Sequence, residues 1–82
     1  MIKSDIEDKL RSYLLEIFFS GDSESLTNET QLLTTGIIDS ISALEMVDFI
    51  EENFKIEFEA HEVDQDNLNS INALTNFILQ KI

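Results

Sequence analysis

The chain of 82 residues contains no cysteine and no proline, only two glycines and only five basic residues. Without cysteine it has no disulfide, no thiolate zinc site and no thiol nucleophile of its own. Because proline and glycine interrupt helices, their scarcity favours long helices over short strands joined by turns. No apolar run approaches the roughly 20 residues that a membrane span needs, and no signal-peptide pattern opens the sequence. We therefore expect a cytoplasmic protein in which residues 1–82 form a single helical domain.

Acidic residues dominate the charged ones that are present. There are 17 acidic and 5 basic residues, which gives a formal net charge of −12. Nucleic acids and anionic lipid surfaces repel a chain of this charge, so neither is an expected partner. Hydrophobic residues make up 43% of the chain, which is enough to build a core. The composition indicates a folded acidic domain whose natural partners are basic surfaces of other proteins.

Hydrophobic residues recur at helical spacing in three long segments and one short one. We expect helices at about residues 4–19, 40–54, 61–66 and 71–81. Residues 4–7 match a capping box for the first helix, and Gly21 is its expected stop. Residues 20–39 form a long loop whose leucines pin it across the core, with a helical turn around residues 29–34. The prediction is an all-α fold: a small four-helix bundle of three main helices and one short helix, with a long loop between helices one and two.

The side chains that enzymatic chemistry requires are scarce. A serine nucleophile needs a base within hydrogen-bond reach, and the one imidazole, His61, lies beyond the second predicted helix. No glycine follows Ser40, so the segment around it is no nucleophile elbow. The segment from Asp64 begins like a calcium loop but fails at three of the required positions. We expect no catalytic residue and no bound metal, and we assign no role to His61.

One segment, Thr-Thr-Gly-Ile-Ile-Asp-Ser-Ile-Ser at residues 34–42, joins the long loop to the second helix. Free backbone N–H groups and the helix dipole make a helix start favourable for a phosphate, so Ser40 could hold a phosphodiester there. The alternative is structural. Either Asp39 or Ser40 caps the helix, and residues 42–45 are themselves a capping box. Taken alone, the local sequence favours the capping interpretation.

The chain as a whole resembles the acyl carrier protein family, which also includes peptidyl and aminoacyl carrier domains. The resemblance rests on Gly-Ile-Ile-Asp-Ser-Ile at 36–41, on the acidic helix that ends Glu-Glu-Asn-Phe at 51–54, and on Asn-Leu-Asn-Ser-Ile at 67–71. In that family the serine of the Asp-Ser motif is esterified to 4′-phosphopantetheine from coenzyme A. The resemblance implies that Ser40 carries this group, whose thiol holds acyl or aminoacyl groups as thioesters. Ser42 matches no attachment position and is assigned to helix capping.

The resemblance also gives the acidic residues of the second helix a specific interpretation. Carriers of this family dock through that helix on basic patches of partner enzymes. The residues expected to recognise partners here are Asp39, Ile41, Glu45, Asp48, Glu51 and Glu52. Like charges one helical turn apart cost on the order of a few tenths of a kcal/mol per pair, so this stripe does not serve stability. The structural alternative is a solvated face that keeps the protein soluble and, for Asp39, a helix cap.

The resemblance further predicts a stand-alone, monomeric carrier that is not an enzyme. We expect it in a specialised polyketide, nonribosomal-peptide or aminoacyl pathway, with fatty-acid synthesis as the alternative. Its expected partners are a phosphopantetheinyl transferase, an acyl- or aminoacyl-activating ligase, and downstream synthases or transferases. The competing classes are an acidic helical adaptor without a prosthetic group and a regulatory domain phosphorylated at Ser40.

Apolar residues of the helices form the core in either interpretation. Leu44 and Met46 are expected in the core or in the lining of an acyl pocket. If a space exists that shelters a bound chain, Phe54, Ile56 and Phe58 are the candidates to line it.

Overall fold

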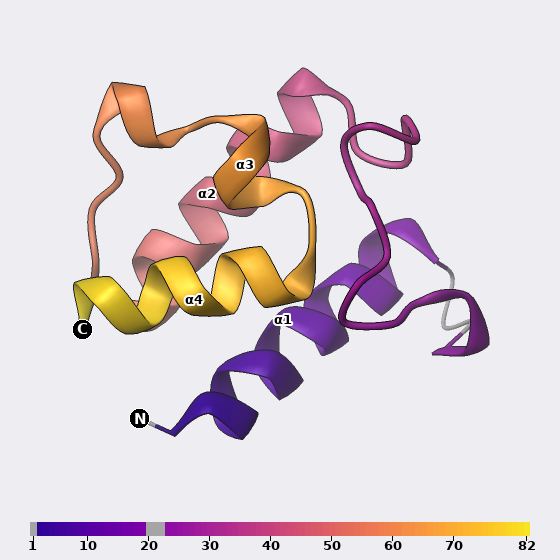
Figure 1. Cartoon of the computed structure of the whole chain (residues 1–82), viewed down its shortest axis with the longest axis horizontal. Coiled ribbons are helices and arrows are strands. Elements are labelled where there is room, and N and C mark those ends of the chain that lie inside the picture. The colour runs from indigo at the N-terminus through magenta and orange to yellow at the C-terminus, as the bar shows by residue number, and fades with distance from the viewer. Residues whose placement is uncertain (1, 20–22) are drawn as a thin grey trace.

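The computed structural model describes residues 2–19 and 23–82, and these residues contain four α-helices and no strand (Figure 1). The helices are α1 (Lys3–Phe18), α2 (Ser40–Phe54), α3 (Gln65–Leu68) and α4 (Ile71–Lys81), with two 3₁₀ turns, η1 (Ser23–Ser25) and η2 (Ala60–Glu62). α4 packs against α1 and α3, and the two chain ends lie on the same side of the molecule (Figure 1). The prediction of an all-α fold with three main helices and one short helix is confirmed. No helix in the described ranges is both long and apolar enough to cross a bilayer.

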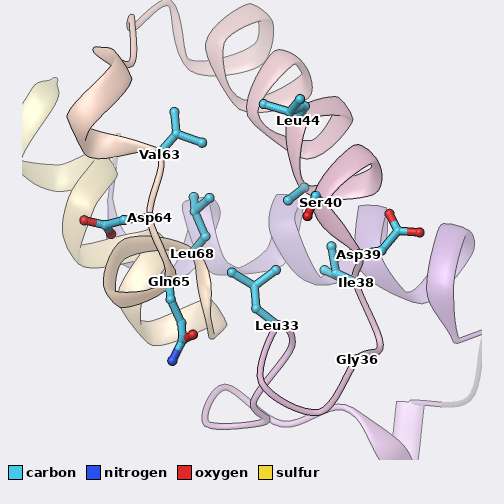
Figure 2. Close-up of a pocket in the computed structure, with 11 residues that line it drawn as sticks. Leu33, Gly36, Ile38, Asp39, Ser40, Leu44, Val63, Asp64, Gln65 and Leu68 are labelled. Carbon is cyan, nitrogen blue, oxygen red and sulfur yellow. The ribbon is translucent and has the colours of Figure 1, made fainter.

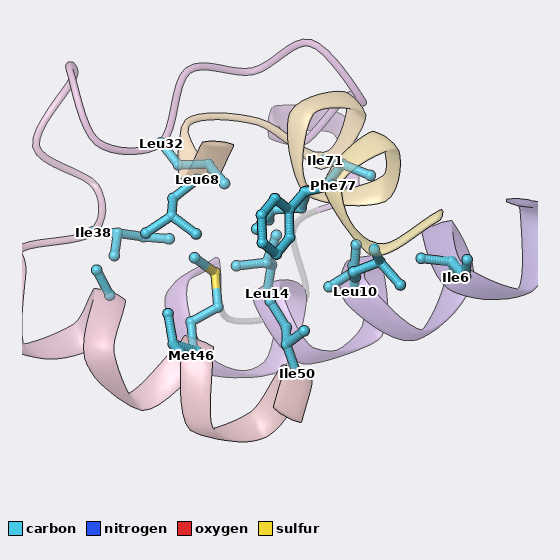
Figure 3. Packing of buried hydrophobic residues seen from close by; sticks show 14 of the residues in the cluster. Ile6, Leu10, Leu14, Leu32, Ile38, Met46, Ile50, Leu68, Ile71 and Phe77 are labelled. Carbon is cyan, nitrogen blue, oxygen red and sulfur yellow. The ribbon is translucent and has the colours of Figure 1, made fainter. Parts of the chain in front are cut away.

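Buried side chains from all four helices and from the long loop form one hydrophobic core (Figure 3). α1 contributes Ile6, Leu10 and Leu14, which recur every four residues and are fully buried. The largest buried side chains from the other elements are Leu26, Leu32, Ile38, Met46, Ile50, Leu68, Ile71, Leu74 and Ile78. Burying a side chain of this size stabilises the fold by about 1.5–3 kcal/mol. Since three of these residues belong to the loop, the loop is part of the core, as its leucines indicated.

Arg11 of α1 fastens the first half of the long loop. Its guanidinium group donates hydrogen bonds to the carbonyl oxygen of Leu26 (2.8 Å) and to the side-chain oxygen of Asn28. The Asn28 side-chain amide in turn donates to the Glu7 carboxylate (3.3 Å), and the backbone carbonyl oxygen of Asn28 accepts the N–H of Asn72 in α4 (3.0 Å). A segment without regular structure must satisfy its polar backbone groups elsewhere, and here the flanking helices do so.

The start of α1 differs from the prediction. The helix begins at Lys3 with Ile2 as its N-cap, and no side chain accepts a hydrogen bond from its first turn. The predicted capping box at residues 4–7 is therefore wrong, because both of its polar residues already lie inside the helix. The expected stop at Gly21 lies outside the described residues. Around residues 29–34 the chain forms hydrogen-bonded turns and no helix.

The remaining helices confirm the predicted pattern with one displacement. α2 spans the predicted residues, and the hydroxyl of Ser70 caps α4 by accepting the N–H of Ala73 (3.0 Å). The brief helix expected at residues 61–66 is instead divided between η2 and α3. The division occurs because the Asp64 side chain accepts the N–H of Asn67 (2.9 Å) and starts a new helix there. At the other end of α2, Lys55 takes the left-handed conformation (φ 57°).

Candidate functional site

Ser40 is the first residue of α2 and its side chain is exposed. Among residues 2–19 and 23–82, no group is hydrogen-bonded to its hydroxyl. The loop reaches it through Gly36, which has φ +80°, a conformation that favours glycine. The Gly36 N–H donates to the carbonyl oxygen of Leu33 (3.1 Å) and closes a turn just before the helix. The hydroxyl thus lies on the surface directly after a closed turn of the loop.

Asp39 is the N-cap of α2, since its carboxylate accepts the N–H of Ser42 (2.8 Å). This hydrogen bond, followed by one from the Ser42 hydroxyl, lowers the pKa of the Asp39 carboxyl below its ordinary value. The prediction that Ser42 caps the helix is wrong: it lies inside the first turn, where its N–H is the donor. Asp39 also brings a negative charge to the helix start, so the backbone N–H groups there are only partly free for a phosphate.

Three exposed apolar residues lie within four positions of Ser40 in the sequence. Ile41 is 71% exposed, Leu44 is 56% exposed, and Ile37 is exposed on the preceding loop. We call these three residues the apolar patch. Large hydrophobic side chains grouped on a surface indicate a contact site, because each costs free energy while it faces water. Ile41, expected to recognise partners, thus lies on the surface beside Ser40, whereas Met46 is buried in the core.

Glu45, Asp48 and Glu52 are exposed along α2, as the docking interpretation requires. The carboxylate of Glu45 also acts on α1: burial raises the pKa of Tyr13, and the charge of Glu45 raises it further. Glu51 differs from the other three acids. Its side chain is half-buried and accepts the backbone N–H of Phe58 (2.7 Å), so this carboxylate also has a structural contact.

A cavity of about 500 Å³ opens beside Ser40, between the start of α2 and the segment that leads into α3 (Figure 2). Its walls are mostly apolar, and Asp39 and Asp64 are the acidic residues that border it. The other lining residues are Leu33, Gly36, Ile38, Ser40, Ala43, Leu44, Val63, Gln65 and Leu68.

The residues expected to line such a space do not line it. Phe54 and Ile56 are buried in the core, and Phe58 stacks on Phe77 of α4 with ring centroids 4.5 Å apart. Leu44 does line the cavity, in agreement with its prediction. The helical spacing of hydrophobic residues predicts which side chains face the interior. It does not predict where the packed side chains leave a cavity.

The Glu59, His61 and Glu62 side chains offer three ligand atoms within 4.8 Å of one another. Two observations account for this cluster without a metal. The carboxylate of Glu62 accepts hydrogen bonds from the ammonium group of Lys81 (2.8 Å) and from the backbone N–H of Glu59 (2.9 Å). The hydrogen bond from Lys81 is the main cause that lowers the pKa of Glu62. The cluster therefore joins η2 to the end of α4.

Asn69 contacts the loop before Ser40, although no sequence pattern indicates it. Its side-chain oxygen accepts the backbone N–H groups of Leu33 and Thr34, which lie 36 and 35 residues away in the sequence. The sequence shows a polar residue next to the Ser70 cap, and the partner of such a residue is visible only in the folded chain.

A protein-family model described as the phosphopantetheine attachment site matches residues 8–78. The chain is also similar to the probable acyl carrier protein PigG of Serratia sp. (strain ATCC 39006). The two are 23% identical over 73 residues, which cover 89% of this chain and 84% of that protein. The matched ranges include Ser40, the cavity and the whole of α2.

Proposed function

The chain belongs to the family of phosphopantetheine-binding carrier proteins, and we propose that Ser40 is the residue that holds the group. The observation that carries this proposal is the Ser40 hydroxyl: exposed, without a partner in the described ranges, at the start of α2 and beside a cavity. Ser42 carries the other hydroxyl in this turn, but its side chain is half-buried and its backbone N–H is already bound to Asp39. Residues 1–82 would then form one carrier domain.

Attachment would form a bond between Ser40 Oγ and the phosphorus of the pantetheine arm. The pyrophosphate bond of coenzyme A would break, and adenosine 3′,5′-bisphosphate would leave. No titratable side chain in the described ranges is hydrogen-bonded to the Ser40 hydroxyl, so a base of the transferase would take its proton. Once attached, the group supplies the thiol that this cysteine-free chain lacks, and the thiol holds acyl or aminoacyl groups as thioesters. The chain itself would provide position and recognition and no catalysis.

We propose that partner enzymes dock on the apolar patch and on the acids beside it. Burying Ile37, Ile41 and Leu44 supplies contact energy that does not depend on salt. Glu45 and Asp48, which are exposed and unpaired by any basic side chain in the described ranges, would attract basic surfaces and speed the encounter. This attraction should weaken as salt is added.

The partners proposed are a phosphopantetheinyl transferase, an acyl- or aminoacyl-activating ligase, and downstream synthases or transferases that meet a monomeric carrier in the cytoplasm. Two sequence features favour a specialised or aminoacyl pathway over fatty-acid synthesis. One is the sequence Gly-Ile-Ile-Asp-Ser at residues 36–40, and the other is the sequence Asn-Ser-Ile at residues 69–71.

The test is to incubate the protein with coenzyme A and a promiscuous phosphopantetheinyl transferase and to measure the intact mass. The unsubstituted protein and the control Ser42→Ala should each gain one phosphopantetheine, and Ser40→Ala should gain none. An adduct on Ser40→Ala would show that another residue is modified. No adduct on the folded unsubstituted protein would favour the acidic adaptor.

A further inference from the structure

Asn69, between α3 and α4, is hydrogen-bonded to three consecutive residues of the loop that precedes Ser40. Its carbonyl oxygen accepts the N–H of Leu32 (2.7 Å). Its side-chain Oδ1 accepts the N–H groups of Leu33 (2.8 Å) and Thr34 (3.2 Å). Both lone pairs of this oxygen are therefore used by the loop. These contacts join parts of the chain that lie on opposite sides of α2 in the sequence.

The same contacts join the two walls of the cavity. One wall is formed by residues 33–44, which run from the loop into the start of α2, and the other by residues 63–68, which include α3. Figure 2 shows the Leu33 side chain between Leu68 and Ile38. The loop part of the first wall has no regular structure and α3 has only four residues, so neither of these two segments is rigid by itself.

The loop that Asn69 holds leads directly to Ser40. The carbonyl oxygen of Leu32 accepts the N–H of Ile38 (3.0 Å), so residues 32–38 form a closed loop. Fixing residues 32–34 therefore also fixes Ile38, which is buried and lies two residues before Ser40. Displacing a reacting group by about 1 Å can slow a reaction by about 100-fold.

We propose that Asn69 is a positioning residue for the attachment reaction. Through the loop of residues 32–38 it sets the place of the Ser40 hydroxyl and holds the two walls of the cavity together. This inference rests on the proposed function of Ser40. Asn69 itself lies outside the apolar patch and outside the acids of α2, so it would act through the loop of residues 32–38, which leads to Ser40 and also carries Ile37 of the patch.

The test compares three variants in the transferase reaction with coenzyme A. Asn69→Leu removes the acceptor while keeping a side chain of similar shape. Asn69→Asp keeps an oxygen acceptor for the Leu33 and Thr34 N–H groups. Ser70→Ala is the matched control, because it removes the cap of the adjacent helix and destabilises the protein while the loop contacts remain.

Asn69→Leu should lower kcat/KM for the carrier about tenfold, because the loop that leads to Ser40 is no longer held. Asn69→Asp and Ser70→Ala should stay within about threefold of the unsubstituted protein. Normal transfer to Asn69→Leu would overturn the proposal. So would an equal loss in Asn69→Asp or in Ser70→Ala, since a general loss of stability would then explain the result.

Amide hydrogen exchange of the unsubstituted protein gives a second measurement that needs no variant to fold. The Leu33 and Thr34 amides should exchange at least about tenfold more slowly than the Thr35 amide, for which the described ranges contain no acceptor. Equal exchange of the three amides would overturn the proposal even if Ser40 is the attachment residue. Absence of an adduct on the unsubstituted protein would instead count against the proposed function, so the two failures are distinguishable.

Discussion

Replacing Glu51 separates a structural role of this acid from a role in docking. Its carboxylate accepts the Phe58 N–H at 2.7 Å, and the Phe58 ring stacks on Phe77 of α4. The bond therefore fastens the segment after α2 to the rest of the fold. A hydrogen bond to a charged group contributes about 1.5–3 kcal/mol when buried, and half-burial of Glu51 reduces this to about 1 kcal/mol.

Glu51→Ala should thus lower the free energy of unfolding by about 1 kcal/mol, which for a chain of this size lowers Tm by about 4–8 °C. Glu52→Ala is the matched control, because Glu52 is an exposed acid on the same turn and should change stability by less than about 0.5 kcal/mol. Urea unfolding followed by circular dichroism measures both. Equal stability of the two variants would refute the structural role of the Phe58 contact.

Glu51→Gln then tests the docking role. Glutamine keeps a side-chain oxygen that can accept the Phe58 N–H but removes the charge. If Glu51 attracts basic partners, this variant should raise KM for the transferase at low salt as much as Glu52→Gln does, and the difference should fade at high salt. Unchanged KM across the salt series would leave Glu51 with the structural role only.

Three further predictions concern a buried hydroxyl, a residue in the left-handed conformation and a helix cap. Thr75→Val should raise the free energy of unfolding by about 1 kcal/mol, because the Thr75 hydroxyl is fully buried and has no hydrogen-bond partner among residues 2–19 and 23–82. A less stable variant in urea unfolding would contradict this. Lys55→Gly should stabilise the end of α2 by up to about 1 kcal/mol in thermal unfolding, whereas Lys55→Ala should not, since only glycine takes φ +57° without a steric cost. The lowered pKa of Asp39 means that its stabilising effect is complete above its ordinary pKa of 3.8 and is lost as the pH falls through the lowered value. Asp39→Asn should therefore show a shallower loss of stability below pH 3.8 in acid titrations followed by circular dichroism, and an identical slope would contradict the cap.

The helices that the sequence predicts best are those with long apolar periodicity. α2 and α4 have the predicted bounds, and α1 differs by one residue at each end. The errors occur at helix starts, where several polar residues can compete for the same N–H groups. Asp39 displaced the capping box expected at residues 42–45, and the expected box at residues 4–7 lies inside α1. At α2 the competing caps are only a few residues apart, so a small difference in free energy decides between them, whereas α1 begins after Ile2 without a side-chain cap.

The proposed attachment site also has a part that the sequence predicts and a part that it does not. Ser40 and Asp39 are adjacent in the sequence, so their place at a helix start could be predicted together with the exposed acids of α2. The lining of the cavity could not, because its walls come from residues 33–44 and 63–68 and depend on how the side chains between them pack. Three apolar residues that could have lined the cavity pack in other places: Phe54 and Ile56 in the core, and Phe58 against Phe77.

By itself, the sequence determined the helical class, the position of α2 and the place of Asp39 and Ser40 at its start. These properties depend on neighbours within one or two helical turns, and local spacing is sufficient to read them. Only the tertiary structure decided which loop residues Asn69 holds, that Glu51 bonds to Phe58, and where the core leaves a cavity. Those features depend on contacts across turns of the chain or between distant segments, where packing geometry selects one partner from many of equal chemical suitability.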